Sequence, residues 1–163
     1  MTTETLPASK TEPTIVMRRT LAAPRERVWA VLTDPVHVRR WYGGHGFENP
    51  VCEMDVRPGG RWHHVMRTPD GHEFPLDFVF VEVVPPEKLS WKNAHPAPPG
   101  LPFHENTVTV TLEADGPRTR WTMVARFRSL ADRDGAMGFG FAKVLGEGVE
   151  KLVGILAAPA GAP

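Results

Sequence analysis

Apolar and polar residues alternate along much of this chain with the two-residue period of half-buried β-strands. In the first such segment Ile15 and Met17 lie on one face, and Val16 and Arg18 lie on the other. Because the connections are short, mostly sequential and marked by glycine or proline, the pattern favours an antiparallel meander. Residues 95–103 contain four prolines and predict a stiff loop. The predicted strands cover residues 14–21, 51–56, 61–67, 74–84, 88–93, 105–113 and 119–127.

Two short helices are predicted between the first and second strands. Pro24 and Pro35 each stand at a position that suits the first residue of a helix, because the backbone N–H that proline lacks has no helical partner there. Asp34 precedes the second proline and can cap that helix by accepting a hydrogen bond from a free N–H. We expect helices over residues 24–32 and 35–41, and the glycines that follow end the second.

A third helical segment lies near the C-terminus. Ser129 and Asp132 have the form of a capping box that would open it. Glu147 and Lys151 lie four residues apart on its polar side and can form an ion pair. The pattern predicts one long amphipathic helix of the kind that lies across a sheet. Its apolar positions recur at helical spacing and are Met137, Phe141, Leu145, Val149, Leu152 and Leu156.

This predicted helix is rich in glycine, and each glycine costs about 1 kcal/mol relative to alanine in a helix interior. Two interpretations stay open. The glycines can leave an empty volume between helix and sheet, or the helix can bend or begin late, near Phe139. Gly138 and Gly140 cannot share a face of a helix, which fits the second interpretation. The glycines are Gly135, Gly138, Gly140, Gly146, Gly148 and Gly154.

The segment from Asp55 to Trp62 contains the most distinctive turn of the chain. Pro58 fixes its entry, and the two glycines that follow can adopt the positive φ angle of a tight turn. With its neighbours, this segment resembles the bacterial branch of the Hsp90-ATPase-activator C-terminal family, within the START-like, helix-grip superfamily of polyketide cyclases and lipid-transfer domains. The similarity extends over residues 14–158. The other segments that carry it are residues 23–35, which lead to Trp41, residues 69–71 and residues 82–89.

The resemblance implies an α+β fold in which a curved antiparallel sheet wraps around the long C-terminal helix. We expect one START-like domain over residues 14–158, with disordered tails at residues 1–13 and 159–163, where there is little to bury. Because the family carries no catalytic signature, three functions stay open. The domain can bind a small hydrophobic or amphipathic ligand. It can be an interaction protein like the Hsp90 ATPase activators. It can also be a cyclase, dehydratase or hydrolase that uses the same cavity.

Candidate ligand-binding residues lie on the predicted inward faces of the strands and of the last helix. Trp62, His64 and Met66 share one face of the strand after the turn, which makes His64 a polar group on an apolar wall. Asn106, with His104 near it, extends another apolar face toward the proline-rich loop. A few polar groups in an apolar pocket are typical of a small-molecule site, although each can also be hydrogen-bonded inside a closed core. The remaining candidates are Trp121, Met123, Phe141, Leu145 and Gly148.

Charge and composition argue against several classes of partner. The chain has 19 Lys and Arg and 19 Asp and Glu, so there is no electrostatic reason to expect binding to nucleic acid. No apolar run approaches the roughly 18 residues of a membrane span, and residues 1–10 lack the apolar core of a secretion signal. We expect a cytoplasmic protein that binds a small molecule without a cofactor. A homodimer and a chaperone partner are left open.

Metal binding and nucleophilic catalysis have no signature in the sequence. His63 and His64 are adjacent on a strand and point to opposite faces, so they cannot share a metal ion. There is no paired cysteine motif and no Ser-His-Asp spacing, and the catalytic residues of any enzyme activity are unknown. We expect no bound metal. Cys52, the single cysteine, is expected to be a small buried side chain.

Overall fold

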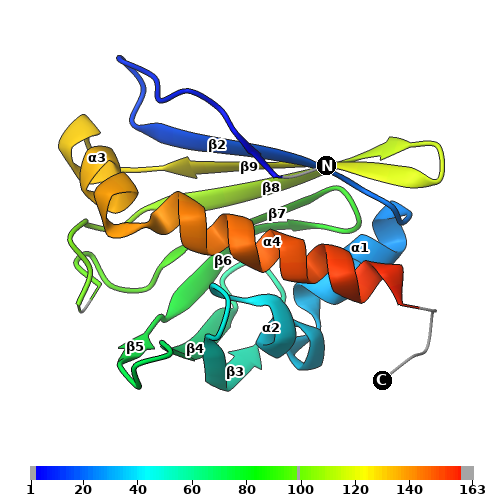
Figure 1. The fold of residues 1–163 in the computed structure, drawn as a ribbon, viewed down its shortest axis with the longest axis horizontal. Helices are drawn as coiled ribbons and strands as arrows, with labels where there is room; N and C mark the ends of the chain where they lie inside the picture. The colour runs from blue at the N-terminus through cyan, green and yellow to red at the C-terminus, as the bar shows by residue number, and fades with distance from the viewer. Residues whose placement is uncertain (1–2, 99, 159–163) are drawn as a thin grey trace.

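The computed structural model describes residues 3–98 and 100–158, in which one curved sheet is crossed by a long helix (Figure 1). Residues 159–163 and the first two residues of the predicted N-terminal tail lie outside this description. Within it, the nine strands follow the order β1-β2-β9-β8-β7-β6-β4-β3, and β5 pairs with β4 beside this path. All of these pairs are antiparallel. The strands are β1 (Glu4–Thr5), β2 (Thr14–Leu21), β3 (Glu48–Met54), β4 (Arg61–Arg67), β5 (Glu73–Pro75), β6 (Phe78–Val84), β7 (Lys88–Asn93), β8 (Thr107–Asp115) and β9 (Arg118–Arg126).

The predicted meander is confirmed, with one strand divided in two. The segment 74–84 forms β5 and β6, because the chain leaves the ladder at Leu76 and Asp77. Leu76 turns its side chain into the core, while its N–H donates to the carbonyl of His64 at 2.7 Å. The carbonyl of Asp77 accepts from the N–H of Ala94 at 2.8 Å. Each of the two residues therefore keeps one backbone hydrogen bond across the interruption.

The two short helices and the turn between β3 and β4 form where the sequence predicts them. The helices are α1 (Arg25–Thr33) and α2 (Pro35–Trp41). Asp34 caps α2 as expected, since its Oδ1 accepts from the N–H of Val36 at 2.9 Å. In the turn, Gly59 has a φ of +80°, and a Cβ on Gly60 would lie 1.9 Å from the carbonyl oxygen of Asp55. Only glycine fits at this second position.

The expected long C-terminal helix is confirmed, but it begins only at Phe141, because the chain breaks at Gly140. Two helices, α3 (Leu130–Phe139) and α4 (Phe141–Ala157), meet at this residue, whose φ of +101° is incompatible with a continuous helix. Ser129 opens α3 as expected, and its Oγ accepts from the N–H of Asp132 at 3.1 Å. The alternative of a helix that begins late, near Phe139, describes α4. Figure 1 shows that α4 alone lies across the sheet.

Helix α4 is held tightly against the chain that follows α2. A Cβ on Gly148 would lie 2.8 Å from the carbonyl oxygen of Trp41, so the absence of a side chain permits this approach. Glu147 accepts from the N–H of residue 45, and Lys151 donates to the carbonyl of residue 44, both at 3.0 Å. The predicted ion pair between Glu147 and Lys151 is therefore not formed. Both side chains bind backbone instead.

Residues 3–13, the described part of the predicted N-terminal tail, contact the sheet and α3 in the structure. Strand β1 pairs with β2. The guanidinium of Arg133 on α3 donates to the carbonyls of Ser9, Glu12 and Thr14 at 2.7, 3.2 and 3.2 Å. This side chain is almost fully buried. Backbone hydrogen bonds, which composition does not reveal, hold a segment that has few apolar side chains to bury.

The core lies between the concave face of the sheet and the helices, with Trp62 of β4 near its centre. This side chain is 1% exposed. Its ring packs against four Tyr, Phe and Trp rings at centroid distances from 4.8 to 5.9 Å, an arrangement that supplies much of the apolar burial. The four partners are Tyr42, Phe78, Phe80 and Trp91.

Candidate ligand-binding site

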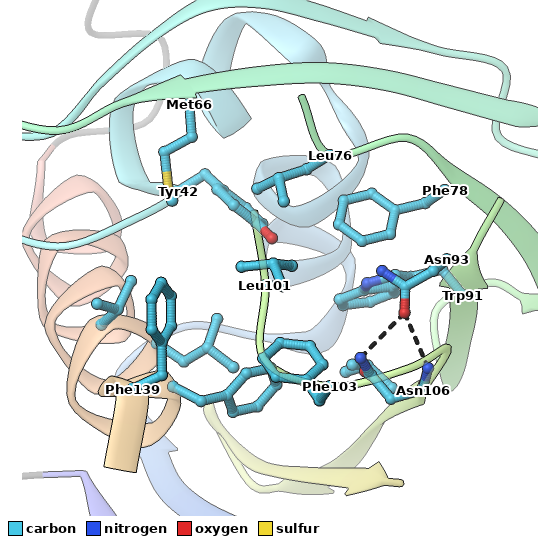
Figure 2. A pocket seen from close by; sticks show the side chains of 14 residues that line it. Tyr42, Met66, Leu76, Phe78, Trp91, Asn93, Leu101, Phe103, Asn106 and Phe139 are labelled. Carbon is cyan, nitrogen blue, oxygen red and sulfur yellow. Dashed lines mark hydrogen bonds between the residues drawn. The ribbon is translucent and has the colours of Figure 1, made fainter. Parts of the chain in front are cut away.

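A cavity of about 90 Å³ lies between the sheet, the proline-rich loop and the junction of α3 with α4 (Figure 2). Inward-facing residues of four strands form one side of the cavity, and residues of α4 form the opposite side. Phe139 at the end of α3 is 49% exposed and marks the rim. The lining side chains are Tyr42, Met66, Leu76, Phe78, Trp91, Asn93, Leu101, Phe103, Asn106, Val108, Phe139, Phe141, Val144 and Leu145.

The break at Gly140 shapes one wall of the cavity. Because α3 and α4 are separate helices, Phe139 and Phe141 can both reach the cavity from opposite sides of the break. Phe141 packs edge-to-face on Phe103 of the proline-rich loop and on Phe127, at centroid distances of 6.0 and 5.3 Å. These contacts connect the loop to α4 and form the apolar floor of the site.

Two asparagines supply polar groups to this apolar wall. The Oδ1 of Asn93 accepts from the backbone N–H of Asn106 at 2.8 Å and from its Nδ2 at 3.0 Å. Since a backbone N–H can only donate, these bonds settle which side-chain atom of Asn93 is the oxygen. The third polar group is the hydroxyl of Tyr42, the residue after α2. Burial raises the pKa of this hydroxyl far above its usual value, so it stays protonated.

A buried network behind Tyr42 sets the position of its ring. The Nε1–H of Trp62 donates to Nδ1 of His64 at 3.1 Å, so Nδ1 carries no proton and Nε2–H donates to Oδ1 of Asn49 at 2.8 Å. The Nδ2 of Asn49 donates to the carbonyls of Arg39 and Tyr42, both at 2.9 Å, and so satisfies the end of α2. Burial, followed by the positive charge of Arg39, lowers the pKa of His64 to about 3. The imidazole is therefore neutral and structural.

A family model decides the identity of the fold. The model of the Activator of Hsp90 ATPase homolog 1-like proteins matches residues 22–157. The chain belongs to this family. The resemblance inferred from the turn at residues 55–62 is thereby confirmed.

Solved structures agree with the family assignment. A protein from Nitrosomonas europaea is 28% identical with a TM-score of 0.81, and 91% of this chain and 96% of that chain are covered. A protein from Rhodobacter sphaeroides is 25% identical with a TM-score of 0.82, covering 96% and 99%. A protein from Arthrobacter aurescens has a TM-score of 0.86 at 24% identity, covering 96% and 92%, and shows the same fold. A comparison with curated proteins found no match.

The cavity contains some of the residues that the sequence predicts for the site and leaves others out. Five of the nine predicted residues do not line it. Trp62 and His64 are buried behind Tyr42, and Gly148 faces the backbone of Trp41 instead of an empty volume. Ligand binding by the other four remains a prediction. Those that line the cavity are Met66, Asn106, Phe141 and Leu145, and the other two that do not are Trp121 and Met123.

Several lining residues were not predicted, because they come from segments without a strand or helix period. Tyr42 directly follows α2, and Leu101 and Phe103 lie in the loop that contains the prolines. The apolar residues within that loop were the available signal, since exposed loops seldom need them. His104, which sequence reasoning placed near the site, instead turns outward, and its Nδ1 lies 2.9 Å from Oδ2 of Asp132.

Metal binding and catalysis by a reactive thiol receive little support from the side chains that the structure describes. Residues 3–98 and 100–158 contain no group of three or more histidines, cysteines or carboxylates placed to hold a metal ion. In the same residues no helix is long and apolar enough to cross a membrane. Cys52 is buried as expected, and burial raises the pKa of its thiol to about 11. A thiol in this state is a poor nucleophile.

Proposed function

We propose that this protein binds a small, mostly apolar molecule in the cavity between the sheet and α4. The observation that carries the proposal is the cavity itself. Protein interiors are packed as densely as organic crystals and contain few voids larger than a water molecule. A volume of about 90 Å³ inside this core is several times the space that one water needs. Its fourteen lining side chains are mostly apolar, as in small-molecule sites.

The composition of the wall favours binding over acid–base catalysis. A general base must lie within hydrogen-bonding reach of the proton that it takes. Among the fourteen lining side chains there is no histidine and no carboxylate. His64, the residue whose pKa is most clearly lowered, lies behind Tyr42 and is bonded on both ring nitrogens. The site is built to hold a molecule.

Binding to a chaperone is the second candidate function, suggested by the name of the family. The observation that favours it is the exposure of apolar side chains on α3, where Leu130, Met137 and Phe139 are 38%, 38% and 49% exposed. An apolar surface of this kind is typical of protein interfaces when its residues are contiguous. Stimulation of an Hsp90 ATPase by the purified protein, lost in a Met137→Glu variant, would support this function over the first.

The cavity proposal is tested by filling the cavity from α4. Val144 lines the cavity, and Val153 lies on the same helix away from it. We expect toluene or cyclohexanone at ten times its Kd to raise the Tm of the wild type by roughly 4 °C, because ligand binds only the folded state. Val144→Phe should remove this rise by occupying the volume. Val153→Phe, the matched control, should retain it. Differential scanning calorimetry gives both Tm values.

Two results of this experiment would overturn the proposal. If neither probe raises the Tm of the wild type, molecules of the right size do not enter the cavity. If Val144→Phe and Val153→Phe respond alike, the probes bind elsewhere. In both cases the exposed surface of α3 becomes the better candidate site.

A further inference from the structure

Two hydrogen-bond donors at the cavity have no partner among the described residues. The Oδ1 of Asn93 takes both hydrogen bonds from Asn106, so its Nδ2 points away from Asn106 with two free hydrogens. The hydroxyl of Tyr42 also makes no hydrogen bond to residues 3–98 or 100–158, although its side chain is buried. Figure 2 shows the Tyr42 oxygen and the Asn93 side chain on the cavity side of the wall. Neither atom is among the fully enclosed side-chain atoms that lack a partner, so both donors are accessible from the cavity.

The position of both donors is set by the fold and not by a flexible surface. Asn93 ends β7, and the backbone N–H of Asn106 locks its amide. The carbonyl of Tyr42 accepts from Asn49, and its ring packs 4.5 Å from the ring of His64. Donors held in this way are preorganised, so a ligand that pairs with them need not order them.

The charge of the wall limits the ligand further. None of the fourteen lining side chains is Lys, Arg, His, Asp or Glu. An anion or a cation would be buried there without a counter-charge, which is strongly unfavourable. A pure hydrocarbon would leave both donors unpaired, which is also unfavourable. A neutral molecule with an acceptor oxygen meets both conditions.

We infer that the cavity recognises a neutral, ring-sized molecule through one carbonyl or ether oxygen, which accepts hydrogen bonds from Tyr42 and Asn93. This inference rests on the proposed function and adds the chemical class of the ligand. The size follows from the cavity volume of about 90 Å³, which is below the roughly 150 Å³ of an engineered cavity that binds benzene. A ligand with more than one six-membered ring would therefore exceed the site.

The experiment compares two probes of equal shape in two proteins. Cyclohexanone carries the acceptor oxygen, and methylenecyclohexane has a CH₂ group in its place. Their Kd values are measured by NMR titration of the methyl groups of Met66 and Leu145, which line the cavity. The quantity that matters is the ratio of the hydrocarbon Kd to the ketone Kd, because this ratio changes between variants only through contacts to the oxygen.

Tyr42→Phe removes one donor and leaves the ring in place. We expect it to lower the Kd ratio by about fivefold, the effect of one neutral hydrogen bond. Since the hydroxyl makes no hydrogen bond to residues 3–98 or 100–158, the Tm of the variant should stay near that of the wild type. Met66→Leu, the control, changes an apolar part of the wall and is followed by the Leu145 methyl groups alone; it should weaken or strengthen both probes alike.

Two results would overturn the inference in different ways. If both probes bind and Tyr42→Phe leaves the Kd ratio within twofold of the wild type, the cavity binds ligands but does not recognise an oxygen. If neither probe shifts the methyl resonances of Met66 and Leu145, the proposed function fails as well.

Discussion

Two glycines on one helix should respond in opposite ways to the same substitution. Gly148 and Gly154 both lie within α4, and each is replaced by alanine. A Cβ on Gly154 meets nothing within 4 Å. A Cβ on Gly148 would lie 2.8 Å from the carbonyl oxygen of Trp41 and 3.2 Å from that of Gly43. Both obstacles are backbone atoms, so they cannot move aside as a flexible side chain can.

The expected magnitudes follow from these contacts. Alanine is favoured over glycine in a helix interior by about 1 kcal/mol, and Gly154→Ala should gain roughly this amount in the free energy of unfolding. Gly148→Ala has the same gain, but it must separate α4 from the end of α2, and overpacking of this kind costs about 1–3 kcal/mol. We expect a net loss of roughly 1 kcal/mol at Gly148. The difference between the two variants is then about 2 kcal/mol.

Urea unfolding, followed by tryptophan fluorescence, measures both free energies with one protocol. A Gly148→Ala variant that is as stable as Gly154→Ala would show that the approach of α4 to Trp41 is not tight, and the reasoning would fail. The substitution has a second readout. Tyr42 follows Trp41 directly, so displacement of that segment should also weaken cyclohexanone binding in Gly148→Ala and not in Gly154→Ala.

Two further predictions concern buried ionisable groups. The folded state lowers the pKa of His64 to about 3, so protons bind the unfolded state more readily and stability is lost as the pH falls below about 6.5. Urea unfolding at a series of pH values should show that this group lowers the free energy of unfolding by about 2 kcal/mol between pH 7.5 and 5. His64→Gln should abolish this loss, and the exposed control His45→Gln should retain it. If the free energy of unfolding of His64→Gln depends on pH as steeply as that of the wild type, the prediction is contradicted. Burial raises the pKa of Cys52 to about 11, so a chromogenic disulfide reagent should modify this thiol at least about a hundredfold more slowly in the folded protein than in urea. Rapid stoichiometric modification of the native protein would refute this.

Local chemistry made most of the fold predictable. The caps at Asp34 and Ser129 act over a few residues, and the structure has both where the sequence places them. The break at Gly140 was open to two interpretations, because a glycine in a helix tolerates either φ sign until packing decides. The contacts of the N-terminal segment could not be predicted, since they are made mainly by Arg133, which is more than a hundred residues away in the sequence.

The site was harder to predict than the fold, because alternation along a strand indicates which face a side chain occupies but not its depth. Trp62 and Met66 share a face of β4, yet Trp62 is central to the packed core and only Met66 reaches the cavity. The same limit applies to His64, whose partner Asn49 lies on the neighbouring strand. Tyr42 has no periodic pattern around it, and its place at the cavity depends on that network.

The short pairing of β1 with β2 also bears on which part of the sheet border is open to another strand. A strand at the border of a sheet offers unpaired N–H and C=O groups to any other strand, and this is a common route to edge-to-edge aggregation. Here Glu4 and Thr5 cover part of that border, and Arg133 occupies the carbonyl of Thr14 at its beginning. This segment looks dispensable by composition, but it covers part of the edge of β2. It therefore occupies backbone hydrogen-bonding groups with which a strand of a second chain could pair.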